Sequence, residues 1–197
     1  MHDLFGVSVL PGLESADEFV TRQEEQALVH AIDRLDLAPF RFQGWLGKRL
    51  THSFGVHYDF DTASLAISEE MPGWLSAVRE RASDFALLSP AMLVQALITR
   101  YDAGAGIGWH RDRPHFDHVV GISLGAPAVM RFRRRVDERF ERAVLPLPPR
   151  GIYHLQGDAR YDWEHSIAEM SATRWSITFR SLSERGRKLL PRLSTGS

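Results

Sequence analysis

The second half of the chain is a series of short β-type runs, and this feature constrains the fold more than any other. Seven runs between residues 92 and 182 are rich in Val, Ile, Phe and Tyr or alternate polar with apolar residues, and Gly, Pro or Asp separates them. The runs read MLVQALITRY, HVVGISLG, AVMRFRRR, RAVLPLP, GIYHLQG, HSIAEM and RWSITFRSL. Strands this short and this closely spaced are typical of an all-β sandwich or barrel such as a jelly roll.

Two helical segments precede these runs. Residues 15–35 are expected to form a helix, because Thr21 and Glu24 have capping-box spacing and apolar residues recur on one face. Residues 71–88 carry a second apolar stripe at helical spacing. Between them, residues 37–62 mix aromatic, Gly and basic residues, which predicts short strands and loops. We therefore expect an α+β chain, with N-terminal helices packed on a jelly-roll core.

Composition limits the class of protein. A length of 197 residues suits one domain, in which residues 90–183 form the core and residues 184–197 a basic, frayed tail. No apolar run is long enough to span a membrane, and the N-terminus lacks the pattern of a secretory signal. The chain has no cysteine and a net charge of -1, so no disulfide is possible and the charge gives no hint of nucleic acid. We expect a cytoplasmic, monomeric protein with no membrane partner.

A polar run at residues 108–118, GWHRDRPHFDH, suggests a metal site. In an extended segment, His110 and Asp112 would project to the same side. Without cysteine, any metal must be held by His, Asp or Glu, and His165 at the start of another β run is the best third ligand. Two histidines and one carboxylate form the facial arrangement of non-haem Fe(II) oxygenases. The alternatives are a solvated loop, or ligation by His115 or His118.

The strand RWSITFR carries a second signal. Alternation places Arg174, Ser176, Thr178 and Arg180 on one side and the apolar residues on the other. Two arginines on one face of a core strand are costly unless an anion satisfies them, and a carboxylate is the usual partner. The alternative is an exposed face on which each arginine pairs with a protein carboxylate. Together with the metal motif, the strand favours a small dicarboxylate held between the arginines and an iron, as 2-oxoglutarate chemistry requires.

These residues, taken together, identify a family resemblance. The segments RLTHSFGVHYDF, LITRYDAGAGIGWHRD, VVGISLG, ARYDWEHSI and RWSITFR occur in the order found in the AlkB family of Fe(II)/2-oxoglutarate dioxygenases. The chain resembles that family over residues 38–182. The most specific element is the combination of His-x-Asp, a distant His and two arginines six positions apart.

The resemblance implies a role for each matching residue. His110, Asp112 and His165 are implied to bind Fe(II). Arg174 is implied to bind the distal carboxylate of 2-oxoglutarate with help from Tyr101, and Arg180 to lie near the metal-side carboxylate. Thr99 stands where the family often has a longer Asn.

The resemblance also implies a nucleic-acid substrate, DNA or RNA. Residues 37–62 are implied to form a nucleotide-recognition lid, in which Tyr58 and Phe60 are aromatic positions that could stack on a flipped base. Pro114 replaces an acidic residue that several nucleic-acid demethylases of the family carry, which leaves the base preference open. Arg131 and Arg133, in a segment with six arginines at residues 131–142, are expected to contact phosphates. The alternative for them is a solvated hairpin edge.

The implied reaction is oxidative removal of N-alkyl groups from nucleic-acid bases, with release of formaldehyde, succinate and carbon dioxide. Two alternatives stay open. The same chemistry could act on a modified tRNA base or on a protein side chain, and a jelly-roll binding protein would need no turnover. A zinc hydrolase would leave Arg174 and Arg180 without a role.

Overall fold

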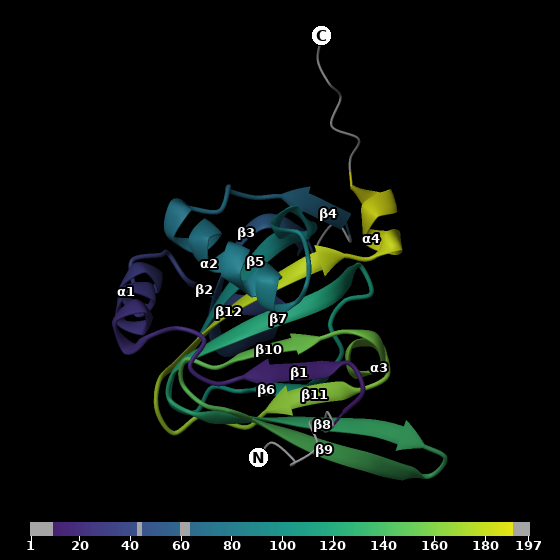
Figure 1. Ribbon diagram of the computed structural model, residues 1–197. Helices are drawn as coiled ribbons and strands as arrows, with labels where there is room; N and C mark the ends of the chain where they lie inside the picture. The colour runs from purple at the N-terminus through teal and green to yellow at the C-terminus, as the bar shows by residue number, and fades with distance from the viewer. Residues whose placement is uncertain (1–9, 43–44, 60–63, 191–197) are drawn as a thin grey trace.

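The computed structural model describes residues 10–42, 45–59 and 64–190, which fold mainly into two antiparallel sheets (Figure 1). The larger sheet has the order β1 (Leu13–Ala16), β10 (Ile152–Leu155), β7 (Phe116–Gly125), β12 (Arg174–Leu182), β5 (Leu93–Tyr101), β3 (Trp45–Asp59) and β2 (Ala38–Phe42), and β4 (Ser64–Ile67) pairs with β3. The smaller sheet has the order β6 (Ile107–His110), β11 (Glu164–Ile167), β8 (Ala128–Val136) and β9 (Arg139–Leu147). Buried residues of both sheets pack together, including Tyr153 and Leu155 of the larger and Phe132 and Leu145 of the smaller. The predicted jelly-roll core is confirmed.

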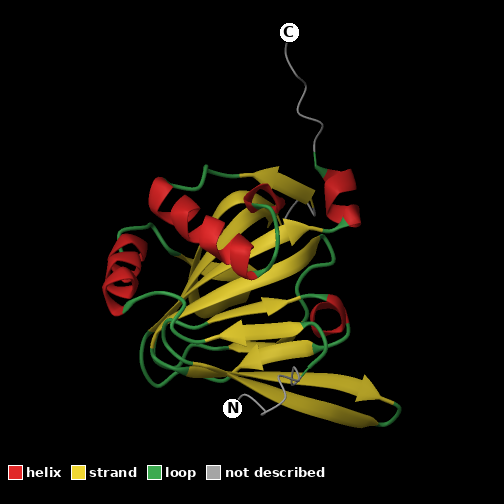
Figure 2. Ribbon diagram, viewed as in Figure 1, coloured by secondary structure: helices red, strands yellow, loops and turns green. Residues whose placement is uncertain are grey.

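Helices cover the outer face of the larger sheet (Figure 2). Leu28 of α1 (Arg22–Ile32) and Leu75 of α2 (Gly73–Phe85) belong to one buried cluster with Ile122 and Ile177 of the sheet. Each such side chain stabilises the fold by about 1.5–3 kcal/mol when it leaves water. A short 3-10 turn, η1 (Pro90–Met92), then leads into β5. This face of the sheet is therefore covered by helices, and only the opposite face can hold the predicted site.

The first predicted helix begins later than expected. Residues 13–16 form β1, because their backbone groups find partners in β10, where Leu13 lies opposite Leu155. Thr21 is the N-cap, and both bonds of the predicted capping box are present: Thr21 N donates to Glu24 Oε2 (2.6 Å) and Glu24 N donates to Thr21 Oγ1 (3.2 Å). The cap was thus predicted correctly, and the helical turns before it were wrong.

Two other segments differ from the expectation. Residues 45–59 form one long strand rather than short strands and loops, since β3 gains backbone partners from β2, β4 and β5. The expected tail instead begins with a helix, α4 (Glu184–Leu189), whose N-cap Ser183 accepts a hydrogen bond from Gly186 N at 3.1 Å. No helix of the described residues is long and apolar enough to cross a bilayer.

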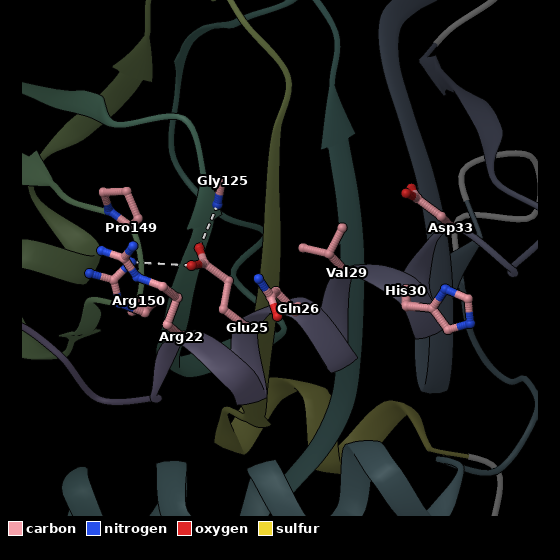
Figure 3. A pocket seen from close by; sticks show the side chains of 9 residues that line it. All are labelled: Arg22, Glu25, Gln26, Val29, His30, Asp33, Gly125, Pro149 and Arg150. Atoms are coloured by element: carbon pink, nitrogen blue, oxygen red, sulfur yellow. Dashed lines mark hydrogen bonds and ion pairs between the residues drawn. The ribbon is translucent and has the colours of Figure 1, made fainter.

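Helix α1 is fixed to the sheet by a buried carboxylate, shown in Figure 3. Glu25 accepts a hydrogen bond from the backbone N of Gly125 at 2.8 Å and forms an ion pair with Arg150 at 3.2 Å. A cavity of about 520 Å³ lies beside this contact, lined mainly by α1 and by residues around Gly125 and Arg150. None of the residues predicted to bind iron or 2-oxoglutarate lines it. The cavity accompanies the helix attachment and lies outside the predicted site.

A pair of histidines joins two strands of the larger sheet. His118 Nδ1 and His154 Nε2 are 2.9 Å apart, so one ring donates a hydrogen bond to the other. Burial, followed by the neighbouring His118, lowers the pKa of His154 to about 4, although Asp117 opposes the shift. Folded protein therefore keeps His154 neutral at a pH where the unfolded chain would protonate it.

We expect this histidine to make the fold sensitive to acid. As the pH falls from about 6.5 to about 4, the unfolded state binds a proton that the folded state refuses, so stability is lost over that window. The loss is on the order of 2 kcal/mol, or roughly 4–8 °C in Tm for a domain of this size. Thermal unfolding of wild type and His154→Gln at several pH values measures it. The variant should lose less stability than wild type on acidification, while His30→Gln, at an exposed position, should behave as wild type; equal acid sensitivity in all three would contradict the assignment.

Candidate functional site

The inner face of the larger sheet is polar where its outer face is apolar. On β12, Arg174, Ser176, Thr178 and Arg180 share the inner face, and the buried Ile177 and Phe179 join the helix-covered cluster. Their neighbours continue the polar row, since Ser176 lies between Thr99 of β5 and Ser123 of β7. The alternation that the sequence predicted is therefore confirmed, and it produces a polar floor between the two sheets.

The smaller sheet brings the two predicted iron-binding histidines together. His110 on β6 and His165 on β11 are register partners, and their ring centroids are 4.3 Å apart. His110 Nδ1 lies 2.9 Å from the carbonyl oxygen of Gly108, which can only accept a hydrogen bond. Nδ1 must therefore carry the proton, and the lone pair of Nε2 stays available, as for a metal-binding histidine oriented by an outer hydrogen bond.

Asp112 follows β6 and lies against both His165 and Arg180. Its Oδ2 is 3.6 Å from His165 Nε2, and its Oδ1 accepts hydrogen bonds from Arg180 Nε (3.1 Å) and Nη2 (2.8 Å). The side chain is only 8% exposed. Burial raises the pKa of Asp112, but Arg180, followed by His165 and His110, more than offsets it and holds the pKa well below the usual range. The carboxylate is therefore charged at every pH at which the protein would work.

Both histidines of this group are held in the neutral form that binds metals. Burial lowers the pKa of His110, and it lowers the pKa of His165 to about 4, although Asp112 opposes both shifts. Among the described residues, no group of three His, Asp or Glu side chains is already spaced as a metal ion requires. The donor types nevertheless fit one, because two neutral imidazoles and a charged carboxylate meet in a buried place. The 3.6 Å between Asp112 and His165 is close to the roughly 3 Å that separates adjacent ligands of one ion.

Arg174 is a buried cation that forms no ion pair with any described residue. It is 1% exposed, its Nε donates to Ser123 Oγ at 3.1 Å, and its Cζ lies 5.3 Å from the ring centroid of Tyr101. Its Nη1 is buried and finds no hydrogen-bond partner among the described residues. An unsatisfied buried guanidinium N–H is costly, so the arrangement calls for an anion supplied from outside the chain.

Arg180, in contrast, is already partnered. It holds Asp112 through two hydrogen bonds, and its Nη1 donates to Gln95 Oε1 at 3.1 Å. The two arginines thus have separate tasks: Arg180 orients the carboxylate, and Arg174 is left available. Thr99 is buried opposite Ser176, on the floor between them.

The residues predicted to bind substrate are dispersed. Tyr58 stacks on His115 with centroids 5.0 Å apart and lies 4.9 Å from the guanidinium of Arg113, so it packs against the loop that carries Asp112. Phe60 lies outside the described residues. Arg131 and Arg133 lie on the outer face of the smaller sheet, over Trp109, and not in the space between the sheets.

Three buried polar residues of the site were missed from the sequence. Gln95 shares the alternation of Thr99 and Tyr101 on β5, so the period of two could have found it. Arg160, on the short helix α3 (Gly157–Tyr161), donates through Nη2 to the carbonyls of Arg113 (2.6 Å) and Phe116 (2.7 Å) and so fixes the loop after Asp112. Tyr153 lies across Gly121, where a Cβ would overlap its ring, and burial raises its pKa to about 12. No local pattern distinguishes Arg160 or Tyr153.

Comparison with known proteins agrees with this geometry. The model of the 2OG-Fe(II) oxygenase superfamily matches residues 16–185. An Arabidopsis thaliana protein named alkylated DNA repair protein ALKBH8 homolog is 29% identical, over 80% of this chain and 51% of its own length. The Mus musculus tRNA (carboxymethyluridine(34)-5-O)-methyltransferase ALKBH8 is 28% identical, over 80% of this chain but 24% of its own length. The chain therefore spans a quarter to a half of these curated relatives.

A solved structure supports the fold. The structure of OsALKBH1 superposes with a TM-score of 0.63 and 17% sequence identity, over 86% of this chain and 96% of that one. At this identity the likeness concerns the fold alone. The match of the family model over most of the chain shows that the chain belongs to the 2OG-Fe(II) oxygenase superfamily, and its relatives above are named as ALKBH8 proteins, which are of the AlkB type.

Proposed function

We propose that the chain oxidises N-alkyl groups on nucleic-acid bases, with Fe(II) as its metal and 2-oxoglutarate and dioxygen as co-substrates. The observation that carries the oxygenase part is the contrast between the two inner arginines: Arg180 neutralises Asp112, whereas the buried Arg174 has an N–H for which the described part of the chain offers no partner. A protein that bound no anion between its sheets would gain nothing from Arg174 at that place.

His110, Asp112 and His165 are the residues we assign to the iron. Two of them are neutral imidazoles and the third is a carboxylate held ionised, so the group would compensate half of the ion's charge. Iron in such a site supplies the activation of dioxygen that oxidation of a carbon–hydrogen bond requires. Arg180 holds Asp112 in place from the larger sheet, and the Gly108 carbonyl fixes the ring of His110.

Arg174 is assigned to the distal carboxylate of 2-oxoglutarate. Its guanidinium can meet a carboxylate with two parallel hydrogen bonds, which makes it a better anchor than a point charge. Tyr101 lies beside it, and Thr99 lies on the strand between Arg174 and Arg180. These residues bind and orient the co-substrate, and the packed sheets on either side exclude water.

The nucleic-acid substrate rests on the relatives. One is named for repair of alkylated DNA and others for modification of tRNA, so both polymers are candidates. A modified tRNA base is the second candidate function, because several ALKBH8 relatives carry a tRNA name. Either reaction uses the same inner site and differs in what the outer surface recognises.

A single assay separates these substrates. The protein would be incubated with Fe(II), 2-oxoglutarate and ascorbate, and with N-methylated single-stranded DNA, the same sequence as RNA, tRNA, or a methylated histone peptide. We expect formaldehyde and succinate in equal amounts from at least one nucleic acid, about tenfold or more above its unmethylated control. Release from the peptide alone would overturn the nucleic-acid assignment and leave the oxygenase chemistry intact.

A further inference from the structure

The outer face of the smaller sheet carries arginines whose charge the protein does not neutralise. Register places His110, His165 and Phe132 on the inner face, so the residues between them point outward. Arg131, Arg135 and Arg142 lie outward, and each makes a hydrogen bond to a neutral group of a described residue: Ser166 Oγ, the Asp137 carbonyl and the Phe140 carbonyl. In the described part of the chain, none of these three forms an ion pair.

Two neighbouring arginines of β8, one on each face, do form ion pairs. Arg134, which alternation turns inward, is held by Glu141 through two hydrogen bonds of 3.1 and 2.7 Å and lies over Trp163. Arg133, which points outward, pairs with Glu164 at 2.7 Å. Two further carboxylates, Asp137 and Glu138, stand at the hairpin turn beyond Arg135. The outer face between that turn and β6 thus keeps an excess of positive charge in a chain whose net charge is -1.

Aromatic rings order these cations across the sheet. Arg131 and Arg133 lie over Trp109, with Cζ 5.3 and 4.5 Å from the ring centroid, and Arg133 and Arg142 lie 4.9 and 5.8 Å from Phe140. Phe140 is 39% exposed and the neighbouring Val144 is 55% exposed. Cation–π contact holds a guanidinium in place without removing its charge or its remaining donors. These stacked rings and guanidiniums form a ladder that crosses four strands, a span of about 14 Å at about 4.8 Å between neighbouring strands.

The ladder begins one residue from the proposed iron site. Trp109 points outward from β6, and His110, the next residue, points inward. β6 is the edge strand of the smaller sheet, so no further strand separates the two faces there. Figure 1 shows the β8–β9 hairpin projecting beyond the rest of that sheet, which leaves its far end open to a partner.

We propose that this outer face, formed by Trp109, Arg131, Arg133, Arg135, Phe140 and Arg142, is the docking surface for the single-stranded polynucleotide on either side of the target base. Phosphates pair with the unneutralised guanidiniums, and exposed bases stack on the rings and guanidinium planes, as in other single-strand binders. The polynucleotide then passes over the edge of β6, so that the target base can enter the proposed iron site between the sheets. This inference rests on the proposed function for its substrate, but binding can be tested without turnover.

The test compares two triple variants of equal charge. Arg131→Gln, Arg135→Gln and Arg142→Gln together alter the surface and spare the Arg133–Glu164 pair. The matched control replaces the exposed Arg22, Arg34 and Arg185 by Gln. Binding of a fluorescein-labelled single-stranded oligonucleotide is followed by anisotropy over a range of salt concentrations. We expect the surface variant to bind about tenfold more weakly, with a slope of log Kd against log salt reduced by about 2, since each lost phosphate contact removes about 0.7. The control should retain the wild-type slope.

Turnover separates this proposal from the proposed function. The surface variant should lose activity on a methylated oligonucleotide but keep the wild-type rate on a methylated nucleoside, which reaches only the inner site. An affinity and salt slope equal to those of wild type would overturn the docking surface, whether or not the wild type oxidises nucleic acid. An acidic peptide that competes as well as the oligonucleotide would assign the surface to a protein partner and also overturn it. Absence of turnover in the wild type, with binding lost in the variant, would reject only the reaction.

Discussion

Asp112→Asn is expected to abolish 2-oxoglutarate turnover while leaving the fold in place. The amide has the shape of the carboxylate, and its oxygen can still accept hydrogen bonds from Arg180. It lacks the charge that would bind iron between the two neutral imidazoles. Loss of an outer hydrogen bond to a metal ligand costs about 10–100-fold, so loss of the ligand itself should exceed that range. Succinate formation and Fe(II) binding, measured together, report this change.

The alanine variant makes a different prediction at the same position. Asp112→Ala would leave the Arg180 guanidinium with only the Gln95 hydrogen bond among the described residues, and breaking a buried pair costs about 3–5 kcal/mol. We therefore expect Asp112→Ala to be inactive and less stable, and Asp112→Asn to be inactive and close to wild type in Tm. Asp117→Asn, which alters a nearby aspartate bonded to Tyr161, is the control and should keep its activity. Turnover by Asp112→Asn at the rate of that control would remove Asp112 from the iron site.

Arg174→Met is expected to weaken the binding of 2-oxoglutarate strongly without destabilising the free protein. The buried guanidinium has one N–H that no described residue accepts, so an unbranched apolar side chain there should cost little stability or even add some. Charged hydrogen bonds contribute about 1.5–3 kcal/mol each, so the concentration of 2-oxoglutarate that half-saturates the protein should rise by about 10-fold to 100-fold or more. Saturation of succinate formation measures this value.

Thermal unfolding gives an independent test of Arg174. 2-Oxoglutarate should raise the Tm of wild type, because a ligand that binds only the folded state stabilises it. The Tm of Arg174→Met should rise only at concentrations about 10-fold to 100-fold higher. Ser123→Ala, which removes the hydroxyl that Arg174 Nε bonds, should weaken the response only a few-fold. A variant that lacks Arg174 but keeps the wild-type saturation curve would show that the co-substrate binds elsewhere.

Much of the fold and site could be predicted because side chains alternate between the two faces of each strand. Strands of period two placed Arg174 and Arg180 on one face and predicted which side of β12 is polar. The same rule places His110 inward and would have placed Gln95 beside Thr99. The pairing of His110 with His165 was predicted because His165 begins another β run, and the resemblance then implied the same pair.

The remaining parts depend on tertiary partners. Residues 15 and 16 were predicted to begin the first helix but lie in β1, whose backbone pairs with β10. Arg160 is buried because two carbonyls of a loop distant in sequence accept its hydrogen bonds. Tyr58 contacts His115 and Arg113, which lie more than 50 residues further along the chain. Such contacts are decided by which loops meet and leave no periodic trace in the sequence.

The inward His110 and outward Trp109 are consecutive residues of one short edge strand, Ile107–His110. Because side chains alternate along a strand, a shift of one residue moves both side chains to the opposite faces of the sheet. Insertion or deletion of a single residue before Trp109 would turn the indole toward the inner site and the imidazole toward solvent. The proposed iron ligand and the proposed docking residue would then be lost together. We therefore expect insertions and deletions to be tolerated at the β8–β9 turn and to abolish function between Ala105 and Asp112.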